Sequence, residues 1–156
     1  MVGEQQFLLE DLIYRGPNAA FKSTSSAYIC WVILAVDQGS FYYEVGEEKG
    51  KASFGDLIFC PPGVPLYRQA STPISFYRIL FEILDTSIKV PSEFPLGKVT
   101  LQNLSRLASN FEYFRKYEYS GGKSHYLQHV FEDLLFLCDS ERQKQPTHQD
   151  PLIMRP

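Results

Sequence analysis

A turn–strand–turn–strand pattern lies near the middle of the chain, at Phe54-Gly55-Asp56-Leu57-Ile58-Phe59-Cys60-Pro61-Pro62-Gly63-Val64-Pro65-Leu66-Tyr67. Gly55-Asp56 is a turn signal, and the apolar run Leu57–Cys60 is typical of a buried strand. Pro62 followed by Gly63 suits the two central positions of a type II turn, after which a new strand begins at Leu66. The pattern predicts an antiparallel β domain.

Segments on both sides of this stretch repeat the same short spacing between turn residues. Apolar or alternating runs separated by Gly, Pro and Ser predict seven strands: Gln6–Tyr14, Tyr28–Val36, Ser40–Val45, Lys51–Phe54, Leu57–Cys60, Leu66–Gln69 and Ile74–Leu84. Short strands joined by turns describe an antiparallel sandwich or barrel and not alternating β-α units.

After Pro95 the apolar period changes from that of strands to that of helices. Apolar residues three or four apart predict an amphipathic helix that begins near Thr100, and Gly121-Gly122 separates it from a second helix that ends near Gln143. We therefore divide the chain into a β-barrel at 1–98, a two-helix dimerisation segment at 99–144 and a linker at 145–156.

Composition excludes several classes of protein. At 156 residues, with 44% hydrophobic and 21% charged residues, the chain has the make-up of one ordinary globular domain. A net charge of -3 gives no basic footprint for nucleic acid. The N-terminus lacks the basic region of a secretory signal, and the longest apolar stretch is about half a membrane span. Three widely spaced cysteines favour a reducing compartment, so we expect a cytoplasmic protein with no membrane partner.

Residues for metal or acid–base chemistry are missing from the predicted barrel. The three histidines are His125, His129 and His148, so the first 124 residues contain none. A metal site inside a β-barrel normally needs imidazoles on its strands. No phosphate-binding loop or nucleophile motif is present. The sequence therefore predicts no metal, no cofactor and no catalytic residue.

The motif at 54–67, together with Val36-Asp37-Gln38-Gly39 and the aromatic strand Ser75–Glu82, resembles the cupin-like N-terminal domain of AraC family transcription regulators. The resemblance covers about residues 5–156. It implies a cupin-like antiparallel β-barrel (jelly roll) followed by two α-helices, which senses a small effector without catalysis. It also implies that the linker leads to a helix-turn-helix DNA-binding domain, absent from this chain, through which alone DNA is bound.

Two positions depart from the family pattern. Leu66 and Leu80 stand where the family usually has histidine, which favours a metal-free member. Two alternatives remain open: a stand-alone carbohydrate-binding cupin, and a cupin isomerase.

By the resemblance, the residues expected at or near the ligand are Gln38, Leu66, Arg68, Phe76 and Arg78. Tyr43 completes the set of six candidates, but it and Tyr28 are weaker ones, because a tyrosine in a barrel is more often part of the core. Guanidinium groups suit a small polar ligand, sugar-like or acidic. Alternation on Ile74–Leu84 leaves the position of Arg78 open: it lies either in the pocket, or on an exposed face as a partner of Glu82.

The second helix carries an apolar stripe wider than the roughly 100° that packing on one surface requires. We expect the excess to be exposed and to form a homodimer, as the resemblance implies. The expected interface residues are Leu127, Val130, Leu134 and Leu137. The alternative is that both sides of the stripe are buried within one subunit.

Overall fold

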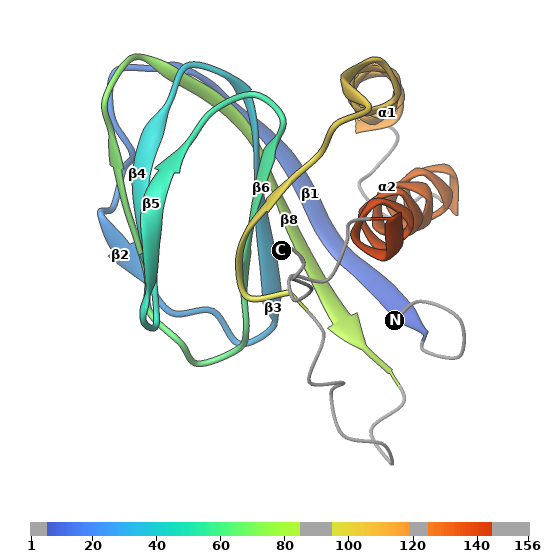
Figure 1. Ribbon diagram of the computed structural model, residues 1–156, viewed down its shortest axis with the longest axis horizontal. Helices are drawn as coiled ribbons and strands as arrows, with labels where there is room; N and C mark the ends of the chain where they lie inside the picture. Colours follow the sequence, from blue (N-terminus) through green and yellow to red (C-terminus); the bar gives the residue numbers. More distant parts are fainter. Residues whose placement is uncertain (1–5, 85–94, 119–124, 145–156) are drawn as a thin grey trace, which may run out of the picture.

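Two antiparallel sheets face each other in the computed structural model, which describes residues 6–84, 95–118 and 125–144. Sheet A has the order β1-β8-β3-β6-β9, and sheet B has the order β2-β7-β4-β5 (Figure 1). The strands are β1 (Phe7–Asn18), β2 (Ser25–Ser26), β3 (Trp31–Gln38), β4 (Phe41–Val45), β5 (Glu48–Ala52), β6 (Asp56–Cys60), β7 (Leu66–Ala70), β8 (Ile74–Ile83) and β9 (Gly97–Thr100).

The strand order identifies the fold. The first eight strands alternate between the sheets as 1-8-3-6 and 2-7-4-5, which is the arrangement of a jelly roll. A ninth strand extends sheet A, where Leu57 of β6 lies opposite Val99 of β9. The predicted fold class, a cupin-like jelly roll followed by two helices, is confirmed.

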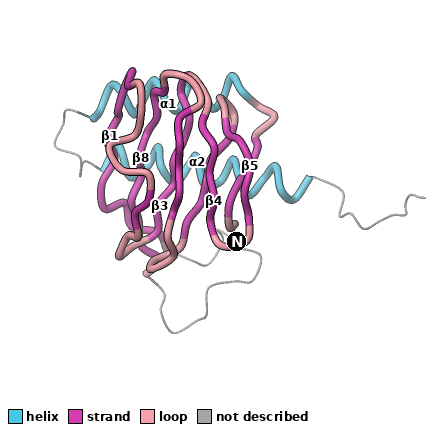
Figure 2. The backbone as a smooth tube through the Cα atoms, turned by 90° about the vertical axis from the view of Figure 1, so that its left-hand side faces the viewer, coloured by secondary structure: helices cyan, strands magenta, loops and turns pink. Residues whose placement is uncertain are grey.

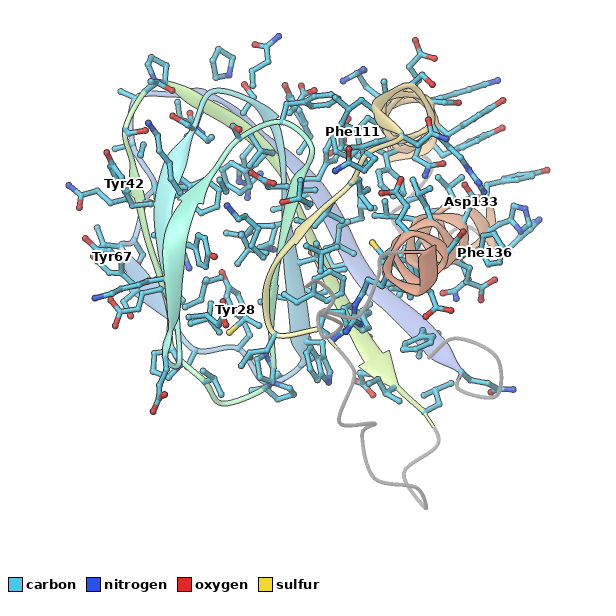
Figure 3. The ribbon with its side chains drawn as sticks, in the orientation of Figure 1. Tyr28, Tyr42, Tyr67, Phe111, Asp133 and Phe136 are labelled. Carbon is cyan, nitrogen blue, oxygen red and sulfur yellow. The ribbon has the colours of Figure 1, made fainter. Side chains whose placement is uncertain are left out.

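Sheet A is buried on both faces, which explains its continuous apolar strands. Val32, Leu34 and Val36 of β3 point toward sheet B and share a core with Phe41 and Ile58. The alternate residues of β3 pack in a second core with the helices. Sheet A is therefore the middle layer, and sheet B turns its other face outward, as the positions of Tyr42 and Tyr67 show in Figure 3.

Two helices cover the outer face of sheet A: α1 (Leu104–Tyr117) and α2 (His125–Lys144). Figure 2 shows both crossing the strands on the far side of the sandwich from sheet B. The first helix begins four residues later than Thr100, because Thr100 ends β9 and its hydroxyl donates to Asp56 Oδ1 at 2.6 Å. Asn103 caps the helix instead, accepting from the Arg106 amide at 3.1 Å.

Local turns account for other differences from the predicted strands. The type II turn is confirmed: Gly63 has a φ of 78°, and the Val64 amide donates to the Pro61 carbonyl at 3.4 Å. The strand expected at Lys51–Phe54 instead begins at Glu48, because the hairpin closes in two residues after Val45. The short strands β2 and β9 were not predicted.

The prediction that α2 carries an exposed apolar strip is wrong. Leu127, Val130, Leu134 and Leu137 are 0%, 8%, 0% and 3% exposed, and all four belong to the core beneath the helices. The alternative, in which both sides of the stripe are buried within one subunit, is the observed arrangement. The physical reason is that α2 packs on sheet A with one side and against the neighbouring helix α1 with another, so it buries two sides instead of one.

The predicted linker at 145–156 lies outside the described residues. None of the described helices is long and apolar enough to cross a membrane.

Candidate functional site

A cavity of about 200 Å³ is lined by residues of both sheets. Strands β1, β3, β7 and β8 and the segment after β1 contribute to it. Its lining residues are Ile13, Arg15, Asn18, Ala20, Phe21, Lys22, Tyr28, Leu34, Arg68, Phe76 and Arg78. Figure 3 places Tyr28 between the sheets. The lining combines aromatic and aliphatic walls with four basic side chains.

Arg68 is a buried cation on the inner face of sheet B. It is 7% exposed, because the pleat of β7 points it toward sheet A while its neighbours Tyr67 and Gln69 face outward. Its guanidinium donates to the Leu66 carbonyl at 3.4 Å and to Ser26 Oγ at 3.1 Å. It also lies 5.7 Å from the centre of the Phe21 ring. These partners hold the side chain in place without neutralising its charge.

Arg78 lines the same cavity from β8 of sheet A. One of its terminal nitrogens lies 3.3 Å from Asp11 Oδ2, at the more exposed end of the side chain. Its Nε atom is buried and has no hydrogen-bond partner. A buried donor without an acceptor is costly, so this atom marks a place where a ligand acceptor or a water is favoured.

The two faces of β8 settle the question that its sequence left open. Tyr77, Ile79 and Phe81 belong to the core beneath the helices, whereas Phe76 lies in the core between the sheets. Arg78 follows Phe76 by two residues and shares its face, so it lies in the cavity and pairs with Asp11 instead of Glu82. The apolar face of β8 is covered by helices and not by the barrel interior.

The cavity brings together three of the six predicted ligand residues: Arg68, Phe76 and Arg78. The other three do not line it. Leu66 and Tyr43 are buried in the core between the sheets, the latter with its ring against Gly50. Gln38 ends β3 and is exposed, since it follows the register shift that separates it from Val36.

Sequence reasoning missed much of the lining. Ile13 and Arg15 alternate along β1, so extending the predicted strand beyond Tyr14 would have found Arg15. Phe21 and Lys22 lie in an irregular segment with no periodic signal. Phe21 nevertheless matters to the site, because its ring packs against Phe41 and Phe76, at centroid distances of 5.2 and 5.0 Å.

Cys60 is a buried thiol of the core between the sheets. Burial raises the pKa of its thiol to about 11, although the positive charge of Arg68 lowers it in part. The thiol donates to the Val64 carbonyl at 3.2 Å. A protonated, hydrogen-bonded thiol is a core residue and not a nucleophile.

Metal ligands do not gather in the described part of the chain. No group of three or more His, Cys, Asp or Glu residues within it is arranged to hold a metal ion. His125 and His129 are both exposed on α2, on the opposite side of sheet A from the cavity.

No protein-family model matches the chain. No curated protein sequence matches it either. Solved structures with a similar fold include a cupin superfamily protein from Desulfitobacterium hafniense, with 12% identity, a TM-score of 0.36, and coverage of 51% of this chain and 79% of that one.

Two further structures have comparable scores. KdgF from Halomonas sp. is 24% identical, with a TM-score of 0.38 and coverage of 53% of this chain and 82% of that one. Oxalate decarboxylase from Bacillus subtilis at pH 4.6 is 19% identical, with a TM-score of 0.38, and the match covers 75% of this chain but only 32% of that one. The fold assignment here rests on the strand order and not on these scores.

Proposed function

We propose that this domain senses a small polar effector, sugar-like or acidic, in the cavity between the sheets and does so without catalysis. The proposal includes the role implied by the resemblance, that of the effector-binding and dimerisation domain of an AraC-type transcription regulator. The alternative is a stand-alone carbohydrate-binding cupin or a cupin isomerase.

One observation carries the proposal: cavity and helices share the same strands. On β8, Phe76 and Arg78 line the cavity while Tyr77 packs against the helices. The Tyr77 hydroxyl donates to the Phe111 carbonyl of α1 at 3.2 Å and accepts a hydrogen bond from Arg115 Nη1 at 3.2 Å. A ligand that shifts β8 therefore acts on the helices, which is what a sensing domain requires.

The regulator assignment is tested by the coding sequence beyond Pro156 and by binding of DNA. We expect a helix-turn-helix sequence there, and we expect the protein that includes it to bind duplex DNA with an affinity that changes when the effector is added. The 156-residue chain alone, with its charge of -3, is expected to leave duplex DNA unshifted at micromolar concentration. An unrelated sequence after Pro156 would favour the stand-alone cupin.

Homodimerisation remains part of the proposal, with a different surface. The outward side of the helices carries Tyr113, Tyr126 and Phe136, which are 47%, 52% and 53% exposed. Figure 3 shows Phe136 pointing away from the sheets. Large exposed aromatic side chains gathered on one face are typical of partner surfaces, so a second copy would pack here instead of on Leu134.

Sedimentation of the double variant Tyr126→Glu/Phe136→Glu tests this surface. We expect a dimer for the unchanged chain at tens of micromolar, and a folded monomer for the variant. Tyr42→Glu is the matched control, because Tyr42 is similarly exposed at 48% on the outer face of sheet B. A chain that sediments as a monomer before any substitution refutes the dimer.

A further inference from the structure

The charges around the cavity are of one sign. Arg15, Lys22, Arg68 and Arg78 line it, whereas none of its described lining residues is Asp or Glu. The one carboxylate in ion-pair contact with these four, among the described residues, is Asp11 at 3.3 Å from Arg78. Arg15 and Lys22 are exposed and therefore hydrated, so the positive charge that a neutral ligand would leave uncompensated is that of the buried Arg68 and the half-buried Arg78.

Arg68 makes the imbalance costly because it is 7% exposed. Its hydrogen-bond acceptors, the Leu66 carbonyl and Ser26 Oγ, are both neutral. A buried guanidinium is stable when a carboxylate or phosphate neutralises it, and its planar fork matches both groups. The unpartnered Nε of Arg78 supplies a further donor in the same cavity.

The remaining walls select for a carbon skeleton. Ile13, Phe21, Leu34 and Phe76 give the cavity aliphatic and aromatic surface beside the cations. Its volume of about 200 Å³ is below the ~300–1,000 Å³ of pockets for drug-sized ligands. An inorganic anion would leave these walls unused, whereas a small organic acid satisfies both the cations and the rings.

We infer that the cavity binds a small organic acid, whose carboxylate is held by Arg68 and Arg78 and whose carbon skeleton packs on Phe21 and Phe76. This inference rests on the proposed function and narrows its ligand from polar to anionic. On this inference the effector carries a carboxylate, which a neutral sugar lacks. The site exchanges stability for binding: without its anion, Arg68 is a buried charge that lowers the free energy of unfolding.

Matched pairs of probes test the anion requirement. Melting temperatures are measured for the 156-residue chain with benzoate against benzamide, with glucuronate against glucose, and with inorganic phosphate, each at about 10 mM in a buffer without other oxyanions. We expect at least one acid to raise the melting temperature by about 2 °C or more, and its neutral partner and phosphate to raise it by less than about 0.5 °C.

Variants assign the effect to the cavity. Arg68→Met should abolish the acid-induced shift, and without ligand it should melt no lower than the unchanged chain, because a binding arginine is expendable for folding. Arg106→Met is the matched control: Arg106 pairs with Asp133 at 2.6 Å on the helices, and its loss should leave the acid-induced shift intact. Arg78→Gln serves as a second cavity variant and should weaken the same shift.

Several results would overturn the inference. Equal shifts from acids and neutral partners would leave effector binding standing but remove the anion requirement. If phosphate raised the melting temperature as much as the acids do, the inference that the ligand has an organic skeleton would be wrong. If neither acid raised the melting temperature, the inferred acid binding would be wrong. If ligand-free Arg68→Met melted well below the unchanged chain, Arg68 would be a structural residue and not a binding residue. None of these results depends on the coding sequence beyond Pro156, so the regulator assignment fails or survives separately.

Discussion

Truncation of Leu134 on α2 distinguishes a core residue from an interface residue. Leu134 is fully buried in the core between sheet A and the helices. Leu→Ala changes at such sites cost about 2–5 kcal/mol, through lost burial and the cavity left behind. For a chain of this length, each kcal/mol lowers the melting temperature by about 2–4 °C. We therefore expect Leu134→Ala to melt about 4–20 °C lower.

The assay is urea unfolding followed by circular dichroism at two protein concentrations. Leu134→Ala should lower the midpoint without changing the slope, and the loss should be the same at both concentrations, because the lost contacts lie within one chain. Phe136→Ala is the control on the same helix: Phe136 is 53% exposed, so its loss should cost less than about 1 kcal/mol.

One result would refute this reasoning. If Leu134→Ala unfolds within about 0.5 kcal/mol of the unchanged chain while its sedimentation shifts from dimer to monomer, Leu134 lies at a partner surface. The packing of α2 on sheet A would then be wrong.

Three further predictions concern the barrel and the helices that cover it. Gly39→Ala should cost about 1–3 kcal/mol in urea unfolding, because Gly39 has a φ of 86° and an added Cβ would overlap the Pro73 carbonyl. Tyr77→Phe should cost a similar amount, about 1–3 kcal/mol, since its hydroxyl bonds the helix layer. Burial raises the pKa of the Cys60 and Cys138 thiols to about 11 and about 12; unfolded thiols ionise near pH ~8.5, so stability should fall as the pH rises above that value. In urea unfolding at a series of pH values, Cys60→Ala should lose less unfolding free energy above that pH than the unchanged chain does. An equal loss in both proteins would contradict the prediction.

Turn chemistry made the barrel predictable from sequence. Pro62-Gly63 specifies one reversal of the chain through a backbone conformation that few other residue pairs adopt. Connections this short leave no room for the crossover helices that parallel strands need, so they favour an antiparallel fold without knowledge of any long-range contact. They do not assign strands to sheets: β6 and β7, on either side of this turn, lie in different sheets. The strand β9 escaped prediction because its pairing with β6 joins segments about forty residues apart, and its four residues carry no strong pattern.

Only part of the candidate site could be predicted from the sequence. Arg68 and Phe76 were placed by the resemblance alone, because alternation along Ile74–Leu84 does not show which face of that strand lines the cavity. Phe21 and Lys22 could not be placed, since an irregular segment has no period and reaches the cavity only through the folded path of the chain. The stripe on α2 shows the complementary limit: its width reveals that two sides are apolar, but only the packing shows that sheet A and α1 cover both.

Strand β8 joins the chemistry of the cavity to the position of the helices. Its residues alternate, so Arg78 and Tyr77 are neighbours in the chain but face opposite layers. If the cavity binds an anion between Arg78 and Arg68, as proposed, the anion would act on the strand whose residue next to Arg78, Tyr77, donates to the Phe111 carbonyl of α1. The anion can shift the position of the helices only to the extent that it binds one position of β8 more tightly than another. Coupling between two binding events is reciprocal: if the ligand changes the affinity of the helices for a second copy packed on Phe136 by some factor, dimerisation changes the affinity of the cavity for the ligand by that same factor.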